Sequence, residues 1–220
     1  KVALIAKNGT GKSTLLDILA GKETAESGKI TLSNNVKVGY FEQIPKLNPI
    51  HSVIEEIFET DNEKLRTVKA FELAITHNNQ EEIASISAKM DELNAWDIEV
   101  EIKQILTQLK ITQLEQKVSE LSGGQHKRLA LAKVLINKPD LLILDEPTNH
   151  LDLETIQAFN NSLSNFKGTV LFTTHDHEFA QTDANIIIVI TPKGVIDRST
   201  TFDEYLDDTK IKELRTKMTS

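Results

Sequence analysis

The amino-acid sequence predicts an α/β domain in which a stretch of helices interrupts the sheet. Two short apolar strands carry the first evidence: Val2 to Ala6 leads into a glycine-rich loop, and Leu141 to Asp145 ends in carboxylates. Strands that alternate with helices are typical of sheets covered on both faces. Between them, residues 49–118 change to the three- and four-residue apolar spacing that predicts helices.

Composition limits the class of protein. A chain of 220 residues has room for one domain with a sizeable core. Its formal charge of −8 gives no bulk basic character for nucleic acid, and it has no cysteine for disulfides or thiolate metal sites. That composition is compatible with a cytoplasmic location. No apolar run approaches the roughly 20 residues of a membrane span. Because the chain opens inside a strand, we expect residues upstream of it.

The loop after the first strand reads NGTGKST and is followed by a helix predicted from Lys12 to Ala20. Gly11, Lys12 and Ser13 fill the second half of the phosphate-loop pattern G-x-x-x-x-G-K-[ST]. In that pattern, backbone N–H groups and the helix N-terminus hold phosphate oxygens, while Lys reaches the β- and γ-phosphates and Ser the Mg²⁺. The alternative is a glycine-rich helix cap without a ligand.

The first glycine of the pattern is replaced by Ala6. A positive φ at that position would cost an alanine about 1 kcal/mol. Farther along, Glu26 to Leu32 and Val36 to Gln43 read as two further strands. Gln43 ends the second one, where an amide can contact both a cation and a water; taken alone, it is an ordinary surface glutamine.

The helical stretch predicts a lobe of its own. Its expected breaks are at Asn78 to Gln80, the tip of a helical hairpin, and at Asn94-Ala95. Residues 61–120 contain 12 acidic and 7 basic side chains, which favours a solvated, protein-facing arm. Trp96 is interpreted as a packing anchor rather than a base-stacking platform.

Ser122-Gly123-Gly124 then begins a helix that is predicted to reach Asn137. A serine and two glycines at a helix N-terminus can expose N–H groups to an anion, or can be a plain N-cap. After the next strand, Asp145 is the candidate metal ligand and Glu146 the candidate water-activating carboxylate. Asp152, after a short polar turn, is placed to report on a neighbouring subunit.

The strand from Gly168 to Thr174 ends at His175-Asp176-His177. A histidine at the carboxyl edge of a parallel sheet can contact a γ-phosphate. A zinc site is the alternative, but no cysteine or matched third ligand accompanies the pair. The other histidines are interpreted as incidental, a hairpin is expected around residues 191–193, and Phe202 to Met218 is expected to be helical.

Taken in order, these motifs resemble the nucleotide-binding domains of ABC ATPases, which are P-loop NTPases. The motifs are AKNGTGKST, Gln43, LSGGQ, LLILDEP, HLD and THD, and they span nearly the whole chain. The resemblance implies an ATP sandwich, in which the phosphate loop of one domain faces the LSGGQ of another. One copy then holds two half-sites, and hydrolysis requires a second ABC domain, in the same chain or in a homodimer. In this family, strands and an adenine-stacking aromatic residue usually precede the phosphate loop, and they are expected upstream of this sequence. The preference for ATP over GTP therefore rests on the resemblance alone.

The resemblance also implies a role for each motif residue. The triphosphate is held by Asn8, Gly9, Thr10, Gly11, Lys12, Ser13 and Thr14. Mg²⁺ is served by Ser13, Gln43 and Asp145. Catalysis falls to Glu146, which polarises the water, His175, which senses the γ-phosphate, and Gln43. The partner's site is completed by Ser122, Gly123, Gly124, Gln125 and Asp152.

The finer string EPTNHLDLETI resembles the ABC-F branch, proteins with two ABC domains in one chain, several of which act on the ribosome. This implies a cytoplasmic ATPase, either a translation factor or an antibiotic-protection protein. A second hypothesis is the ATPase subunit of a membrane transporter, although such subunits more often have a small residue and Ala where Asn149 and His150 stand. A third is a module that binds ATP only to dimerise, against which Glu146 and His175 argue.

The expected organisation is a single ABC ATPase domain. Residues 1–48 and 119–200 form the nucleotide-binding core with a small β portion, and its N-terminal strands are expected to be missing. Residues 49–118 form the helical lobe, and 201–220 a terminal helix or the start of a linker.

Overall fold

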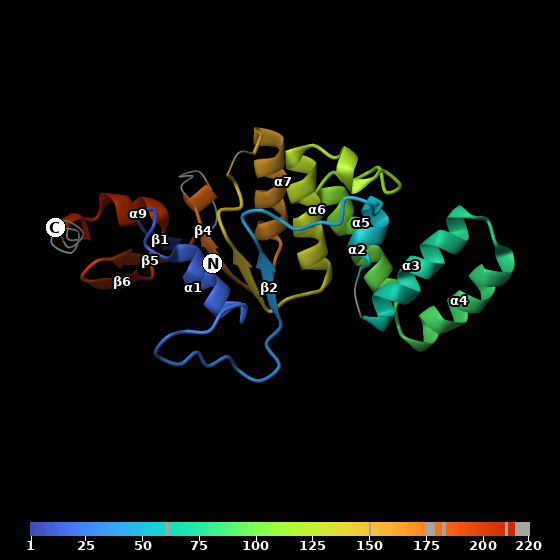
Figure 1. Cartoon of the computed structure of the whole chain (residues 1–220), viewed down its shortest axis with the longest axis horizontal. Coiled ribbons are helices and arrows are strands. Elements are labelled where there is room, and N and C mark those ends of the chain that lie inside the picture. The colour runs from blue at the N-terminus through green and yellow to red at the C-terminus, as the bar shows by residue number, and fades with distance from the viewer. Residues whose placement is uncertain (60–61, 150, 175–178, 182–183, 210, 214–220) are drawn as a thin grey trace. The chain divides into compact units, whose positions relative to one another are not determined.

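The chain divides into two compact units in the computed structural model, which describes residues 1–59, 62–149, 151–174, 179–181, 184–209 and 211–213. The core unit comprises Lys1–Pro45 and Asn137–Ser220, and the helical unit comprises Lys46–Ile136 (Figure 1). Residues 119–136 were expected in the core, but they group with the helical unit. The reason is that their helix, α6 (Gly123–Ile136), packs against helices α2 and α5 of that unit.

A six-stranded sheet forms the centre of the core unit, in the spatial order β2-β3-β4-β1-β5-β6. Every neighbouring pair is parallel except β5 and β6, which form the predicted antiparallel hairpin. The strands are β1 (Val2–Ile5), β2 (Val38–Phe41), β3 (Leu141–Leu144), β4 (Thr169–Thr173), β5 (Ile186–Thr191) and β6 (Gly194–Arg198). The α/β fold predicted from the alternating strands and helices is therefore confirmed.

Helices cover both faces of this sheet. On one face, Leu16 of α1 (Lys12–Leu19) packs with Leu4 and Ile143, and Tyr40 joins the same cluster. Neighbouring strand residues point to opposite faces. Accordingly Phe41, next to Tyr40, packs edge-to-face on Phe159 of α7 (Leu153–Ser164) on the other face, with 5.4 Å between the ring centroids. The burial of both faces explains why the strand sequences are apolar almost throughout.

Two expected elements differ from the prediction. Glu26 to Leu32 forms no strand, and Ile30 and Leu32 are 40% and 43% exposed. A strand needs a neighbouring strand whose backbone N–H and C=O groups pair with its own, and each described strand of the sheet pairs only with other strands of that sheet. The predicted C-terminal helix is interrupted: α9 spans Phe202–Asp207, Asp208 has an extended backbone, and residues 209 and 211–213 are helical again.

The helical unit contains α2 (Val53–Ile57), α3 (Glu63–Thr76), α4 (Gln80–Glu92), α5 (Trp96–Gln108), a 3-10 turn (Val118–Glu120) and α6. Both predicted breaks are confirmed: Asn78 and Asn94 follow α3 and α4 with φ of 52° and 48°. Asparagine tolerates this left-handed backbone, so it ends helices well. Trp96 packs edge-to-face on Phe71 at 4.9 Å, which confirms it as a packing anchor. No helix among the described residues is long and apolar enough to cross a membrane.

A buried ion-pair network links α2 to α6 inside the helical unit. Glu56 is 1% exposed and accepts hydrogen bonds from Lys133 Nζ at 2.6 Å and from His51 Nδ1 at 2.9 Å. Lys133 also contacts Glu59 at 2.9 Å. Burial by itself lowers the pKa of Lys133, but the hydrogen bonds to Glu56 and Glu59 outweigh it and raise the pKa above its ordinary value. His51, interpreted as incidental, is thus part of the packing.

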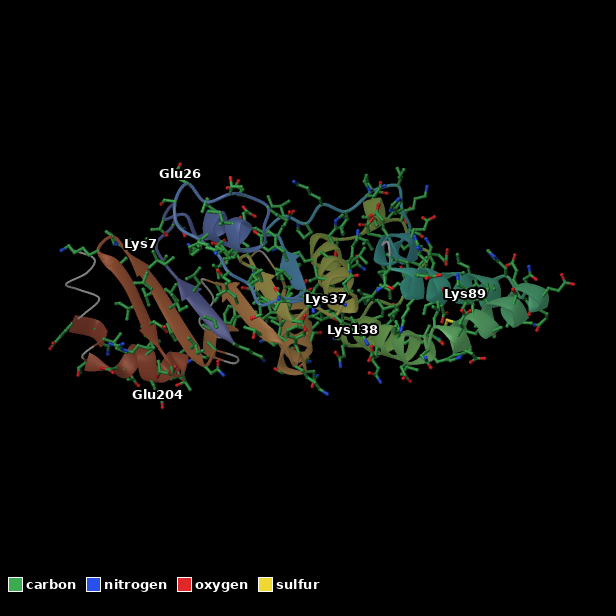
Figure 2. All side chains as sticks on the ribbon, turned by 90° about the horizontal axis from the view of Figure 1, so that it is seen from below. Lys7, Glu26, Lys37, Lys89, Lys138 and Glu204 are labelled. Atoms are coloured by element: carbon green, nitrogen blue, oxygen red, sulfur yellow. The ribbon has the colours of Figure 1, made fainter. Side chains whose placement is uncertain are left out.

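We expect Lys133→Met to destabilise the protein by about 3 kcal/mol, because it leaves the buried Glu56 carboxylate without its cation. The control is Lys89→Met, since Lys89 pairs with Glu63 at 3.1 Å but is 51% exposed (Figure 2). That change should cost less than about 1 kcal/mol. Urea unfolding measures both, and equal effects would contradict the assigned role of the network. Because the folded pKa of Lys133 is raised, its contribution is complete below the unfolded pKa of about 10.4 and is lost as pH rises through the folded value.

Candidate active site

The glycine-rich loop connects β1 to α1 and is shaped by two glycines. Gly9 and Gly11 have φ of 77° and 85°, in the left-handed region that favours glycine, and neither would clash through an added Cβ. It is the backbone conformation, and not crowding, that requires glycine here. Ala6 does not have a positive φ, so the expected cost of replacing the first loop glycine does not arise.

The N-terminus of α1 is open to an anion. Its N-cap is Gly11, without a side-chain cap hydrogen bond, and its first turn has no acidic residue. The unpaired N–H groups of that turn and the helix dipole therefore favour a negatively charged ligand. Ser13 and Thr14 are exposed in the same turn.

Lys12 is the charged residue of the loop, and its side chain is only 7% exposed. Its Nζ donates to Ala6 O at 3.2 Å, to Lys7 O at 3.4 Å and to Asn8 Oδ1 at 3.4 Å. These acceptors hold the ammonium group against the loop, 4.0 Å from Glu146 Oε1. A buried cation is thus fixed next to the open helix N-terminus.

The carboxyl ends of β2 and β3 bring Gln43 and Glu146 together. The two strands are parallel, with Phe41 opposite Leu144, so the residues two positions beyond each lie opposite one another. Gln43 Nε2 donates to Glu146 Oε2 at 3.1 Å. The structure therefore brings Gln43 and Glu146, both predicted as site residues, into direct contact.

Asp145 and Glu146 have different environments. Asp145 is 3% exposed, and its Oδ1 accepts a hydrogen bond from the Thr173 hydroxyl at 2.9 Å. The same Thr173 oxygen accepts from Glu146 N, also at 2.9 Å. Glu146 has left the strand conformation with φ of 45°, which is uncommon for a residue other than glycine. One threonine on β4 thus orients the first carboxylate and holds the backbone of the second.

Two residues of this arrangement were not identified from the sequence. Asn149 Nδ2 donates to Glu146 Oε2, so the carboxylate accepts from two amides. In the sequence, Asn149 was noted only as a marker of a subfamily. Thr173 looked like an ordinary β-branched strand residue, and only the pairing of β3 with β4 brings it to Asp145.

The remaining predicted residues lie elsewhere or outside the described residues. Ser122 and Gln125 cap α6 in the helical unit: Gln125 N donates to Ser122 Oγ at 3.2 Å, and Ser122 N to Gln125 Oε1 at 2.8 Å. Asp152 caps α7 by accepting from Thr155 N at 2.7 Å. His175, with Asp176 and His177, is not among the described residues, so its predicted role is not tested, and neither is the alternative zinc site.

The core unit therefore gathers at one sheet edge an open helix N-terminus, a buried cation and two carboxylates in different environments. The first two suit a phosphate chain. Carboxylate, hydroxyl and amide oxygens suit Mg²⁺. Asp145 has one oxygen bonded to Thr173, and Gln43 uses its NH₂ for Glu146, so each keeps an oxygen to offer a cation. The residues present fit a phosphate ligand with a hard divalent cation.

Comparison with known proteins agrees with this chemistry. The sequence profile of the family described as "ABC transporter" matches residues 1–149. The chain is 42% identical over 195 residues to the ABC transporter ATP-binding protein YfmR of Bacillus subtilis, covering 85% of the chain and 31% of that protein. It is 34% identical over 197 residues to the energy-dependent translational throttle protein EttA of Escherichia coli K12, covering 86% and 36%.

Other matches extend over nearly the whole chain. The ATP-binding protein Uup of Haemophilus influenzae is 34% identical over 221 residues, covering 97% of the chain and 34% of that protein. The solved structure of an RNase-L inhibitor superposes with a TM-score of 0.65 at 22% identity, covering 99% of this chain and 42% of that one, which supports the fold. The chain spans about a third of the length of the curated relatives it matches. It belongs to the ABC transporter family, as an ABC-type ATPase nucleotide-binding domain most like the ABC-F branch.

Proposed function

We propose that this domain binds ATP with Mg²⁺ and hydrolyses it when paired with a second ABC domain. The observation that carries the proposal is the position of Glu146, whose carboxylate accepts from Gln43 and Asn149 and lies 4.0 Å from Lys12. A carboxylate held by neutral donors beside a phosphate-binding loop is suited to accept a proton from an attacking water.

The residues of the core unit divide the work as follows. The loop from Asn8 to Thr14 binds the triphosphate, with Lys12 on the β- and γ-phosphates. Ser13, Gln43 and Asp145 hold Mg²⁺, which when bound neutralises charge on the phosphate oxygens. Glu146 orients the water and accepts its proton. His175 contacts the γ-phosphate in this proposal.

The second half-site of the proposal belongs to α6. Gly123 has a helical backbone, and a Cβ added there would meet nothing within 4 Å. The fold therefore does not require glycine at this first residue of α6. A ligand that approaches the helix closely is a physical reason to keep glycine at position 123. Ser122, Gly123, Gly124 and Gln125 would complete the ATP site of the partner domain, with Asp152 at the same interface.

We further propose that ATP-driven pairing acts on the ribosome in the cytoplasm, in translation or in antibiotic protection. The name of the relative EttA describes it as a translational throttle. Asn149 supports the same reading, because in this chain it has a structural task at Glu146 where transporter subunits more often have a smaller residue.

The test is sedimentation of the Glu146→Gln protein with ribosomes, with and without ATP. We expect ATP-dependent co-sedimentation, because a variant that binds ATP without turnover keeps the domains closed. Lys12→Ala, which is expected to weaken nucleotide binding, is the control and should stay in the supernatant at ATP concentrations that saturate the Glu146→Gln protein. A protein that retains ATP but stays off ribosomes would overturn the ribosomal role and favour a transporter partner. A protein that neither retains nor turns over ATP would overturn the ATPase itself.

We expect Thr173→Val to lower ATP turnover about 10-fold with little change in ATP affinity. Valine keeps the shape of threonine but removes the bonds to Asp145 Oδ1 and Glu146 N, each worth about 1 kcal/mol or more when buried. Thr169→Val, at an exposed position of the same strand, is the matched control. Single-turnover kinetics measures the rate of ATP hydrolysis separately from ATP affinity. Turnover that falls only in proportion to lost stability would mean that Thr173 is a packing residue.

A further inference from the structure

We propose that a small cavity in the helical unit binds a compact oxyanion, such as inorganic phosphate, with Arg128 as its principal contact. The cavity has a volume of about 90 Å³ and lies between the loop after α5 and the first turns of α6. We call it the Arg128 cavity; its polar lining consists of Lys110, Thr112, Gln113, Gln116, Gln125 and Arg128. This site is separate from the phosphate loop and does not depend on ATP hydrolysis.

Arg128 carries an unsatisfied charge-bearing group. Its Nε is buried and has no hydrogen-bond partner among the residues that the structure describes. Buried donors in native proteins nearly always have a partner, so an orphaned guanidinium nitrogen calls for an explanation. The guanidinium is always ionised, and its planar set of N–H groups matches the oxygens of phosphate and carboxylate.

The charges of the side chains that line the Arg128 cavity favour a negatively charged ligand. Two cations and three amides line it, and no acidic side chain does among the residues that the structure describes. This is notable in a lobe whose residues 61–120 contain 12 acidic and 7 basic side chains. The volume suits a compact anion, whereas sites for larger ligands such as nucleotides are roughly 300 Å³ or more.

The cavity also reaches the turn that begins α6. Gln125 lines it, and the same side chain accepts from Ser122 N at 2.8 Å through Oε1. Its carbonyl end is thus committed to the helix cap, and its NH₂ end is left to donate to an anion. An oxyanion held by Arg128 and Gln125 would stabilise the Ser122–Gln125 turn in this conformation.

The experiment is a titration of the whole chain with inorganic phosphate, followed by ¹H–¹⁵N NMR at the Arg128 Nε–H and the glutamine side-chain amides. We expect saturable shifts of these signals at millimolar phosphate. Arg128→Gln should weaken the site at least 10-fold. Lys127→Gln removes the same charge one residue away, outside the cavity lining, and should leave it unchanged.

Phosphate also suits the glycine-rich loop, so the amides of Gly9 and Gly11 report on that site separately, and Lys12→Ala should weaken it without affecting the Arg128 signals. Shifts confined to the loop would overturn the proposal, as would equal losses in Arg128→Gln and Lys127→Gln. If Arg128→Gln fails to fold, Gln113→Ala, at an exposed loop position, provides the test. It should weaken phosphate binding about 3-fold at the cavity signals, and unchanged binding would count against the site.

Discussion

Replacing Glu146 by glutamine is expected to slow ATP turnover by on the order of 10²-fold or more while ATP binding persists. Glutamine has the same shape but cannot accept a proton from water. In this structure the carboxylate accepts from Gln43 and Asn149, and it also lies 4.0 Å from Lys12 of the loop. Lys12 keeps its three acceptors within the loop when the carboxylate is lost, so the substitution removes a proton acceptor and leaves the hydrogen bonds of the loop in place. Phosphate release by paired domains and retention of labelled ATP measure the two quantities.

The control for this substitution is Glu26→Gln. Glu26 is exposed on the segment between α1 and β2, far along the chain from both carboxylates (Figure 2). It changes the net charge by the same amount and should leave turnover unaltered. Turnover by Glu146→Gln near that of the unaltered protein would remove Glu146 from the proposed mechanism. A loss of ATP binding in parallel with turnover would instead indicate a structural role.

Replacing Lys12 by alanine is expected to weaken ATP binding itself by roughly 10- to 100-fold, the size of one lost charge-assisted contact to phosphate. The ammonium group is 7% exposed and held by acceptors of the loop, so little entropy is lost when it turns to a ligand. Equilibrium binding of a fluorescent ATP analogue measures the change. Turnover should fall with occupancy.

Lys29→Ala is the matched control, because Lys29 is an exposed lysine of the core unit with no part in the loop. The Lys29→Ala variant tests whether loss of any positive charge in the core unit weakens nucleotide binding. Equal affinity of Lys12→Ala and the unaltered protein would mean that the glycine-rich loop is only a helix cap. Removal of Mg²⁺ by a chelator should reduce ATP affinity in the Lys29→Ala protein as in the unaltered one.

Part of the site could be read from the sequence because short segments fix their own geometry. The NGTGKST loop needs left-handed backbone at two positions, and glycines stand at both, Gly9 and Gly11. Asn78 and Asn94 end helices for a related local reason. The apolar strands end in polar residues where the sheet ends, so Gln43, Asp145 and Glu146 could be assigned to its carboxyl edge.

Segments that depend on a distant partner were predicted less well. Glu26 to Leu32 has the composition of a strand, but a strand forms only where another backbone pairs with it. The helix that begins at Gly123 was expected in the core, within residues 119–200. Its buried side chains pack on α2 and α5 and place it in the helical unit.

The sequence by itself determined the α/β class, the phosphate loop, the two carboxylates and the membership of the ABC family, because each is encoded in a continuous stretch of residues. The tertiary structure alone decided which groups meet at Glu146. Gln43, Asn149 and Thr173 reach the two carboxylates from separate segments, and their roles follow from strand order and register. The same holds for Arg128, whose Nε is buried without a partner in a cavity that the loop after α5, α6 and Val53 form together. Contacts between distant segments depend on the packing of the whole unit, which no local pattern of residues records.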